Sequence, residues 1–299
     1  MALFFTLSGF LIVTTLTRNP SVPSFLIRRF CRIMPLVILA TLVYLPLQQK
    51  SIEYFPSHLL LFTNFDFSHQ TNFTSHYWSL CVEAHFYLTV AALAACFGLR
   101  GLTLLPVLMF AVTFMRVRGG HVAAIWTHHR VDEILVGASL AAIRQGDFGK
   151  AGRIVHRMIR ALPSACWLAL FLLSCHSVSH ELQYARGYLA AALVGSTLID
   201  RGRLNSILAS RTLRYIAEIS FALYIIHPLS HFGRLGSGGP VEKYSKRILC
   251  FAISFGLAHL STYYFERHWI HLGKRWARRF DRVPPVAKAW TRPETRLIV

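Results

Sequence analysis

Long apolar blocks, separated by short stretches that carry Arg, Lys, His and Pro, make up most of the chain. The blocks run for roughly 15–20 residues, which is about the length that a helix needs to cross the hydrocarbon core of a bilayer. Because backbone polar groups in lipid must be satisfied within the segment, each block predicts a membrane-spanning helix. The pattern therefore predicts an all-α fold, a polytopic transmembrane helix bundle of about nine spans. The expected spans cover residues 1–17, 33–47, 79–98, 101–115, 132–144, 160–176, 187–199, 213–232 and 248–265.

The composition agrees with a membrane protein. Hydrophobic residues make up 54% of the 299 positions and charged residues 15%, whereas about 25% of the residues of a soluble domain are charged. Charged side chains are therefore too few to cover a water-facing surface. The 6 cysteines show no spacing typical of a metal site, so we expect them to be buried apolar side chains, and we expect no metal.

The net charge of +19 would favour a nucleic-acid partner if the protein were soluble. Here the Lys and Arg residues gather in alternate loops, which the positive-inside rule assigns to the cytoplasmic side. These basic stretches are residues 18–32, 100, 144–160, 201–214 and the tail from 267. We therefore expect a multi-pass protein of the inner (plasma) membrane with a cytoplasmic C-terminus, anionic membrane lipid as a partner, and no nucleic acid.

The sequence predicts one membrane-embedded domain, residues 1–266, followed by a basic cytoplasmic tail, residues 267–299. Two external loops differ from the rest. Residues 48–77 contain an apolar stretch that is too short to span and suits a re-entrant or interfacial segment. Residues 233–247 are rich in glycine, which predicts a flexible linker.

Three arginines, Arg28, Arg29 and Arg32, precede the second expected span, and on a helix Arg32 neighbours the other two. They have two interpretations. They anchor the helix by the positive-inside rule, or their guanidinium groups bind phosphate, as a nucleotide-bearing cofactor such as coenzyme A would require.

Glu83 lies inside an apolar span, where a carboxylate costs about 2.5–3.5 kcal/mol unless it is paired or hydrated. On a helix it shares a face with Ser79 and Tyr87. A buried carboxylate suits a general base or a group that orients an imidazole. The alternative is a structural ion pair, for which Arg130, expected near the same membrane face, is the candidate partner.

Two histidines are further candidates. His76 lies one helical turn before Ser79, and His227 lies near the external end of a span and directly precedes Pro228, which ends or kinks a helix. A structural role is the alternative for each.

The motifs, taken in order, resemble the integral-membrane acyltransferase family 3, which includes bacterial O-acetyltransferases of O-antigen, exopolysaccharide and nodulation factors. The segments that carry the resemblance are FFTLSGFLI (4–12), RRFCRIMP (28–35), HYWSLCVEAHFYL (76–88), the stretch from Arg130 to Gly137, and ISFALYIIHPL (219–229).

The resemblance implies a ten-helix bundle and an acyltransferase-like domain over residues 1–266. It implies that the protein is an O-acyltransferase, which takes an acetyl or other short acyl group from acetyl-CoA or another acyl-CoA and delivers it to a hydroxyl of a cell-surface or secreted carbohydrate. It also implies that Arg29 and Arg32 help to hold the acyl-CoA and that Glu83 is required for activity.

The family's first helix, which carries an arginine and the proposed catalytic histidine, precedes the helix that begins this sequence. We expect that helix to be missing here, so His76 and His227, with Arg130, become the candidates beside Glu83. A misplaced gene start, a partner chain that supplies the helix, or a truncated inactive relative would each explain its absence. A non-catalytic membrane transporter or flippase for a glycan is the remaining alternative.

Overall fold

The structure, a computed structural model, describes residues 1–145, 148–176, 181–199, 203–231 and 239–281. Within these ranges the chain forms helices joined by turns, without a strand, which confirms the predicted all-α class. Each of the nine expected segments overlaps a helix. These helices are α1 (Ala2–Arg18), α2 (Val22–Leu47), α4 (Trp78–Phe97), α5 (Leu105–Arg118), α7 (Asp132–Gln145), α9 (Ser164–Ser174), α10 (Leu182–Ile199), α12 (Arg211–Ile226) and α13 (Pro240–Leu260).

Among the described residues, three helical segments are long and apolar enough to cross a membrane: Val22–Leu47, Ser75–Arg118 and Tyr244–Phe280. A fourth crossing is added if α8 (Gly149–Arg160) and α9, which meet at an 89° bend, count as one span. The protein is therefore a multi-pass membrane protein. The expected total of nine spans is not confirmed.

The helices group into two compact units, which we describe separately. Unit 1 comprises residues 1–26, 82–205 and 280–299, and unit 2 comprises residues 27–81 and 206–279. The boundaries fall within α2, α4 and the short helix α11 (Arg203–Leu208).

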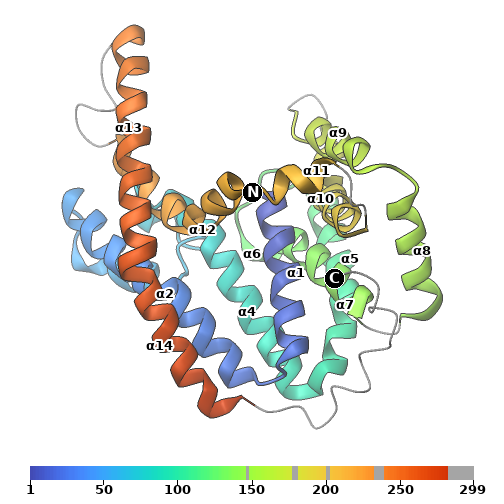
Figure 1. The fold of residues 1–299 in the computed structure, drawn as a ribbon. Coiled ribbons are helices and arrows are strands. Elements are labelled where there is room, and N and C mark those ends of the chain that lie inside the picture. The colour runs from blue at the N-terminus through green and yellow to red at the C-terminus, as the bar shows by residue number, and fades with distance from the viewer. Residues whose placement is uncertain (146–147, 177–180, 200–202, 232–238, 282–299) are drawn as a thin grey trace. The chain divides into compact units, whose positions relative to one another are not determined.

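In unit 1, α1 packs against α7 at backbone distance (Figure 1). A Cβ atom on Gly9 would lie 2.0 Å from the carbonyl oxygen of Ile134, and one on Gly137 would lie 1.9 Å from that of Thr6. Side chains at these positions would force the helices apart, so both glycines are required for the contact. The Thr6 hydroxyl also donates to the carbonyl oxygen of Glu133, at 3.2 Å.

Further helices of unit 1 pack against α7. Both α5 and α10 contact it, and the short helix α6 (Thr127–Arg130) leads into it. A Cβ atom on Gly187 of α10 would lie 3.2 Å from Glu133, so α10 passes close to the N-terminal end of α7. The connection after α1 is tied to the far end of the chain by Asp281, which accepts hydrogen bonds from Asn19 and Ser24 at 2.7 Å and 2.6 Å.

In unit 2, hydrogen bonds of polar side chains hold the long loop of residues 48–77 in place. It contains the short helix α3 (Phe55–Leu59) and several 3-10 turns. His58 is fully buried: its Nδ1 donates to the carbonyl oxygen of Tyr54 at 2.7 Å, and its Nε2 lies 2.8 Å from the Thr74 hydroxyl.

The last helical run is continuous from Pro240 to Phe280, and all of it up to Arg279 belongs to unit 2. It consists of α13, a π-helical segment (Ser261–Glu266), α14 (Arg267–Ala277) and a final 3-10 turn. The linker predicted over residues 233–247 is therefore helical from Pro240 onwards, because the apolar helix extends back by two turns. Residues 233–238, and residues 282–299 of the predicted tail, lie outside the described residues.

Candidate active site

Glu83 projects from α4 and is only 5% exposed in unit 1. The hydroxyl of Ser8 on α1 donates to its Oε1. The Tyr87 hydroxyl, one turn further along α4, donates to the same oxygen at 2.5 Å. Two hydroxyl groups from different helices therefore compensate the burial of this carboxylate. Sequence reasoning placed Tyr87 on the same face as Glu83, but it missed Ser8, for which the SGFL segment was the available signal.

The expected partner of Glu83, Arg130, lies in a buried charge cluster at the start of α7. Its guanidinium is 3.4 Å from Glu133, and Arg116 of α5 lies 2.6 Å from Asp132 and 3.9 Å from Glu133. All four side chains are at most 8% exposed. The pairing of Arg130 with Glu83 stays a prediction. Sequence reasoning did not single out Arg116, which is one of two arginines in the last turn of α5.

Arg116 is held on several sides. One guanidinium nitrogen donates to the carbonyl oxygen of Gln183 at 3.2 Å, and the group lies over the ring of Tyr184, 5.4 Å from its centroid. The carboxylate of Asp132 also accepts from Thr113, at 3.3 Å. The cluster links α5, α7 and α10, and removal of one member would leave an uncompensated charge buried in unit 1.

In unit 2, the two candidate histidines come together although they are far apart in the sequence. The ring centroids of His76 and His227 are 5.2 Å apart, and the ring of Tyr224 packs against both, at 5.0 Å and 6.0 Å. The Tyr224 hydroxyl donates to the carbonyl oxygen of His76 at 2.6 Å and lies 2.7 Å from the Ser79 hydroxyl. We call these four side chains the histidine pair site.

The tautomer of His227 follows from its backbone contact. Its Nδ1 lies 2.7 Å from the carbonyl oxygen of Tyr224. A carbonyl oxygen only accepts, so Nδ1 carries the proton in the neutral ring and Nε2 carries the lone pair. His227 is exposed, whereas both ring nitrogens of His76 are buried and have no hydrogen-bond partner within the described part of the chain. The pair thus combines an accessible basic nitrogen with a second imidazole behind it.

The predicted cofactor-binding arginines lie on α2, also in unit 2. Arg32 is exposed and Arg29 is half-buried. The buried carboxylate of Glu266 interacts electrostatically with Arg32. Hydrogen bonds from Ser261 (3.1 Å) and Thr262 (3.2 Å) hold that carboxylate within the π-helical segment. Such segments often occur where a helix must present functional side chains.

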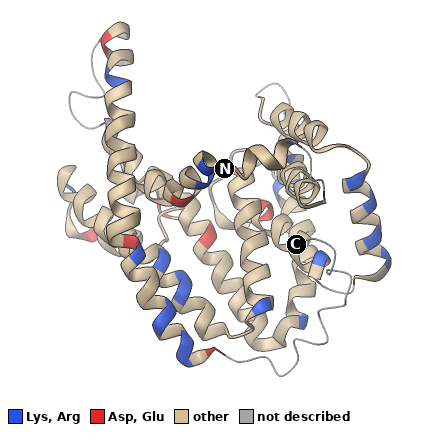
Figure 2. Cartoon of the chain, viewed as in Figure 1, with Lys and Arg blue, Asp and Glu red and all other residues tan. Residues whose placement is uncertain are grey.

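Helix α14 adds further cations beside α2. A Cβ atom on Gly273 would lie 2.6 Å from the Cβ atom of Cys31, so the two helices touch at this glycine. Figure 2 shows the basic residues along both helices. We call them the basic surface of unit 2: Arg28, Arg29, Arg32, Lys274, Arg275 and Arg278.

A second group of aromatic and imidazole rings lies in unit 1, before α7. The rings of His121 and His128 are each 4.2 Å from that of His129, and Trp126 stacks on His128 at 5.8 Å. Burial, followed by the neighbouring histidines, lowers the pKa of His129. No group of three metal-ligating side chains occurs among the residues that the structure describes, and the expected absence of a metal stays a prediction.

No curated protein and no solved structure matches the chain. A family model described as an acyltransferase domain, that of acyltransferase family 3, matches residues 1–266. Because this match covers most of its length, the chain belongs to acyltransferase family 3, a family of membrane acyltransferases.

Proposed function

We propose that the protein is an O-acyltransferase of the inner membrane that transfers an acetyl or other short acyl group from acyl-CoA to a hydroxyl of a cell-surface or secreted carbohydrate. The observation that carries the proposal is the hydrogen bond between Nδ1 of His227 and the carbonyl oxygen of Tyr224. It fixes an exposed imidazole in the tautomer that accepts a proton through Nε2, and acyl transfer to a hydroxyl requires such a base.

The reaction balances with this group as the base. The acceptor hydroxyl gives its proton to Nε2 of His227 as its oxygen attacks the thioester carbonyl carbon. The carbon–sulfur bond then breaks, and the imidazolium returns the proton to the departing thiolate, so the products are an ester and coenzyme A. His76 lies against His227 and Tyr224, and we assign it the role of positioning the ring of His227.

The basic surface of unit 2 supports acyl-CoA as the donor. Coenzyme A carries several phosphate groups, and guanidinium groups bind phosphate through two parallel hydrogen bonds. Arg29 and Arg32 are the candidates for this contact, and Glu266 holds Arg32 in place through its charge. A surface that gathers this many cations suits a polyanion better than a neutral donor.

The direction of transfer rests on the distribution of charge. The basic surface includes the arginines near the start of α2, which belong to the basic stretch of residues 18–32 that the positive-inside rule assigns to the cytoplasm together with the C-terminus. The charged phosphate groups of acyl-CoA prevent it from crossing a bilayer unaided, so this donor stays in the cytosol. A carbohydrate acceptor outside the cytoplasm agrees with His76 and His227, which the predicted topology assigns to the external side.

The experiment is transfer of labelled acetyl from acetyl-CoA to glycan in membranes that contain the protein. We expect transfer by the unaltered chain, its loss in Glu83→Gln, and a marked decrease at low acetyl-CoA concentration in Arg32→Ala. Arg214→Ala is the matched control, because Arg214 is an exposed arginine of α12 outside the basic surface. Normal transfer by both test variants would refute the assigned roles, and no transfer by the unaltered chain at normal abundance would refute the activity.

One observation favours the transporter alternative. The cluster of Arg116, Arg130, Asp132 and Glu133 is buried in an apolar helix bundle, and ionisable residues in such positions occur in proton relays and transport pathways. Deletion of the gene separates the two functions. Loss of acetylation with normal glycan export supports the transferase, whereas loss of export with normal acetylation supports the transporter.

A further inference from the structure

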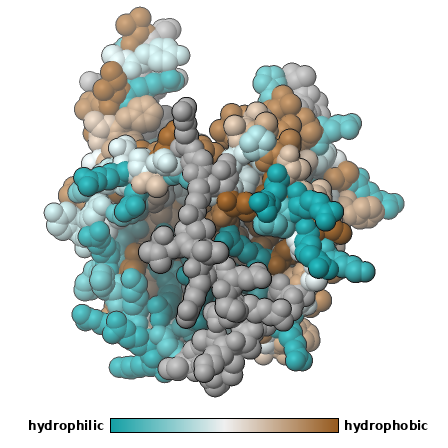
Figure 3. Space-filling view, turned by 45° about the vertical axis from the view of Figure 1, so that its right-hand side comes forward, coloured by the Kyte–Doolittle hydropathy of each residue, from teal (hydrophilic) through white to brown (hydrophobic). Residues whose placement is uncertain are grey.

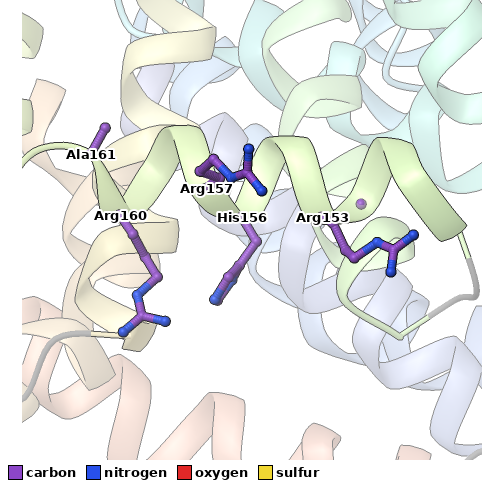
Figure 4. A pocket seen from close by; sticks show the side chains of 6 residues that line it. Arg153, His156, Arg157, Arg160 and Ala161 are labelled. Carbon is purple, nitrogen blue, oxygen red and sulfur yellow. The ribbon is translucent and has the colours of Figure 1, made fainter.

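Helix α8 differs from every other long helix of unit 1 because its cations are concentrated on one side. Lys150, Arg153, Arg157 and Arg160 recur at spacings of three and four residues, so they share one side of the helix, with His156 at its margin. Figure 4 shows Arg153, His156 and Arg160 projecting from the same side of α8, with Arg157 on the adjoining side. These side chains line an open depression of about 600 Å³.

These cations have no acidic partner within the described part of the chain. The ion pairs found there involve other residues, and the sequence from Phe148 to His176 contains neither Asp nor Glu. All of the basic side chains of α8 are exposed. A helix that carries so many like charges needs an anionic partner or water on that side.

The neighbouring side of α8 is apolar and partly uncovered. Ile154 is 56% and Met158 61% exposed. Ile159, further round the helix, is buried against Gly195 of α10, where a Cβ atom would meet its side chain at 2.8 Å. The helix therefore docks on unit 1 through one edge and leaves an apolar strip beside its cations. In Figure 3 hydrophilic and hydrophobic residues lie side by side at the right of the molecule, where α8 lies.

The bend between α8 and α9 bears on how α8 is oriented relative to the membrane. The apolar helix α9 follows at an angle of 89°, and the indole nitrogen of Trp167 fixes the corner by donating to the carbonyl oxygen of Ile159 at 3.0 Å. Leu172 and Leu173 of α9 are more than half exposed, which suits contact with lipid chains. If α9 runs along the membrane normal, α8 lies in the plane of the membrane surface.

We propose that α8 is an interfacial helix that binds the phosphate groups of anionic phospholipids through Lys150, Arg153, Arg157 and Arg160, with Ile154 and Met158 inserted among the acyl chains. An amphipathic helix with a basic side and an exposed apolar strip binds anionic bilayers in this way. The same basic stretch belongs to the loops that the positive-inside rule assigns to the cytoplasm, and the cytoplasmic leaflet is the anionic one. The proposal does not depend on the acyltransferase reaction.

Hydrogen–deuterium exchange of the full chain in nanodiscs tests the proposal. We compare nanodiscs of phosphatidylcholine with nanodiscs that also contain phosphatidylglycerol. Because each cation near an anionic surface strengthens binding about fivefold, we expect amides of residues 149–160 to exchange several-fold more slowly in the anionic nanodiscs. Raising the salt from about 0.1 M to about 1 M shortens the Debye length from about 10 Å to about 3 Å and should remove the difference.

The variant R153Q/R157Q/R160Q should lose this protection. Its matched control is R144Q/R211Q/R214Q, which removes three exposed arginines from α7 and α12 and should keep it. A second variant, I154S/M158S, retains the cations but lacks the apolar strip and should lose part of the protection.

Three outcomes would overturn the proposal. One is equal exchange of residues 149–160 in the two kinds of nanodisc. Another is equal loss of protection in the two triple variants, which would indicate attraction to the whole charged chain rather than a site on α8. The third is protection of α8 by coenzyme A in phosphatidylcholine nanodiscs, which would assign the cations to the donor.

Discussion

The carbonyl oxygen of Tyr224 accepts a hydrogen bond from Nδ1 of His227, 2.7 Å away, so the residue three positions earlier decides which nitrogen of His227 is basic. The same tyrosine reaches the backbone of His76 with its hydroxyl. Main-chain and side-chain groups of Tyr224 thus hold both histidines of the histidine pair site.

This relationship separates two variants of the pair. His227→Gln removes the base, and we expect transfer to fall by about 10²–10⁴-fold, the usual contribution of general base catalysis. Tyr224→Phe keeps the carbonyl acceptor but removes the hydroxyl that contacts His76 and Ser79, so a smaller loss is expected. Initial rates of acetyl transfer at saturating acetyl-CoA measure both. Equal losses in the two variants would contradict the assignment of the base to His227.

Glu83 gives a second prediction. Glu83→Gln should abolish transfer, while Ser8→Ala and Tyr87→Phe should each reduce it, because each removes one of the two hydroxyl donors to Oε1. A charge-assisted hydrogen bond contributes about 1.5–3 kcal/mol, so each single variant should also lower the free energy of unfolding. Transfer rates and unfolding in detergent are measured together. Full activity of Glu83→Gln would be the contrary result.

The helices of unit 1 were predictable because they are apolar blocks bounded by charged residues or proline. The close contact of α1 with α7 was not predictable. It depends on Gly9 and Gly137, and the pattern of apolar residues does not distinguish these two from the other glycines among the 18 in the chain. The contact depends on backbone shape at two points, and a single sequence contains no information on which helices approach so closely.

The sequence predicted several residues of the candidate site but not their contacts with one another. Glu83, His76 and His227 are polar side chains in apolar helices, which is why the sequence singled them out. The partners Ser8 and Tyr224 were missed because hydroxyl groups are common in apolar helices and differ less from their surroundings than a carboxylate or an imidazole does. His58 was missed because it lies in a loop where polar residues are common, and only its burial distinguishes it.

Arg32 and Glu266 give a third prediction, on the donor side. Arg32→Ala should raise the KM for acetyl-CoA more than it lowers kcat, because the phosphate groups lie away from the reacting carbonyl. Glu266→Gln should shift KM in the same direction by a smaller factor, since the Arg32 guanidinium remains but lacks its carboxylate neighbour. Arg32→Lys tests geometry, because lysine cannot form the paired contact. Unchanged KM in Arg32→Ala would exclude this arginine from donor binding.

The cluster of unit 1 gives a fourth prediction, on stability. Arg116→Ala leaves Asp132 buried without its partner at 2.6 Å, and breaking a buried pair from one side costs about 3–5 kcal/mol. Replacing both residues, as R116L/D132L, should cost less than Arg116→Ala alone, because no uncompensated charge remains. Unfolding in detergent, followed by tryptophan fluorescence, compares them. A double variant less stable than the single one would argue that the cluster has no pairing energy.

His58 makes the stability of unit 2 depend on pH. Burial, with a smaller contribution from His69, lowers its pKa below the ordinary value of 6.5. The neutral ring is therefore the folded form: its Nδ1 donates to Tyr54 and its Nε2 accepts from Thr74. As the pH falls below 6.5, the unfolded chain binds a proton that the folded chain does not, so stability is full above 6.5 and is lost on acidification. The slope for one group is about 1.4 kcal/mol per pH unit.

His58→Asn should remove this slope between about pH 5 and about pH 6.5. The control is His271→Asn, which replaces an exposed histidine of α14. Equal slopes in the unaltered chain and in His58→Asn would assign the acid sensitivity to another group.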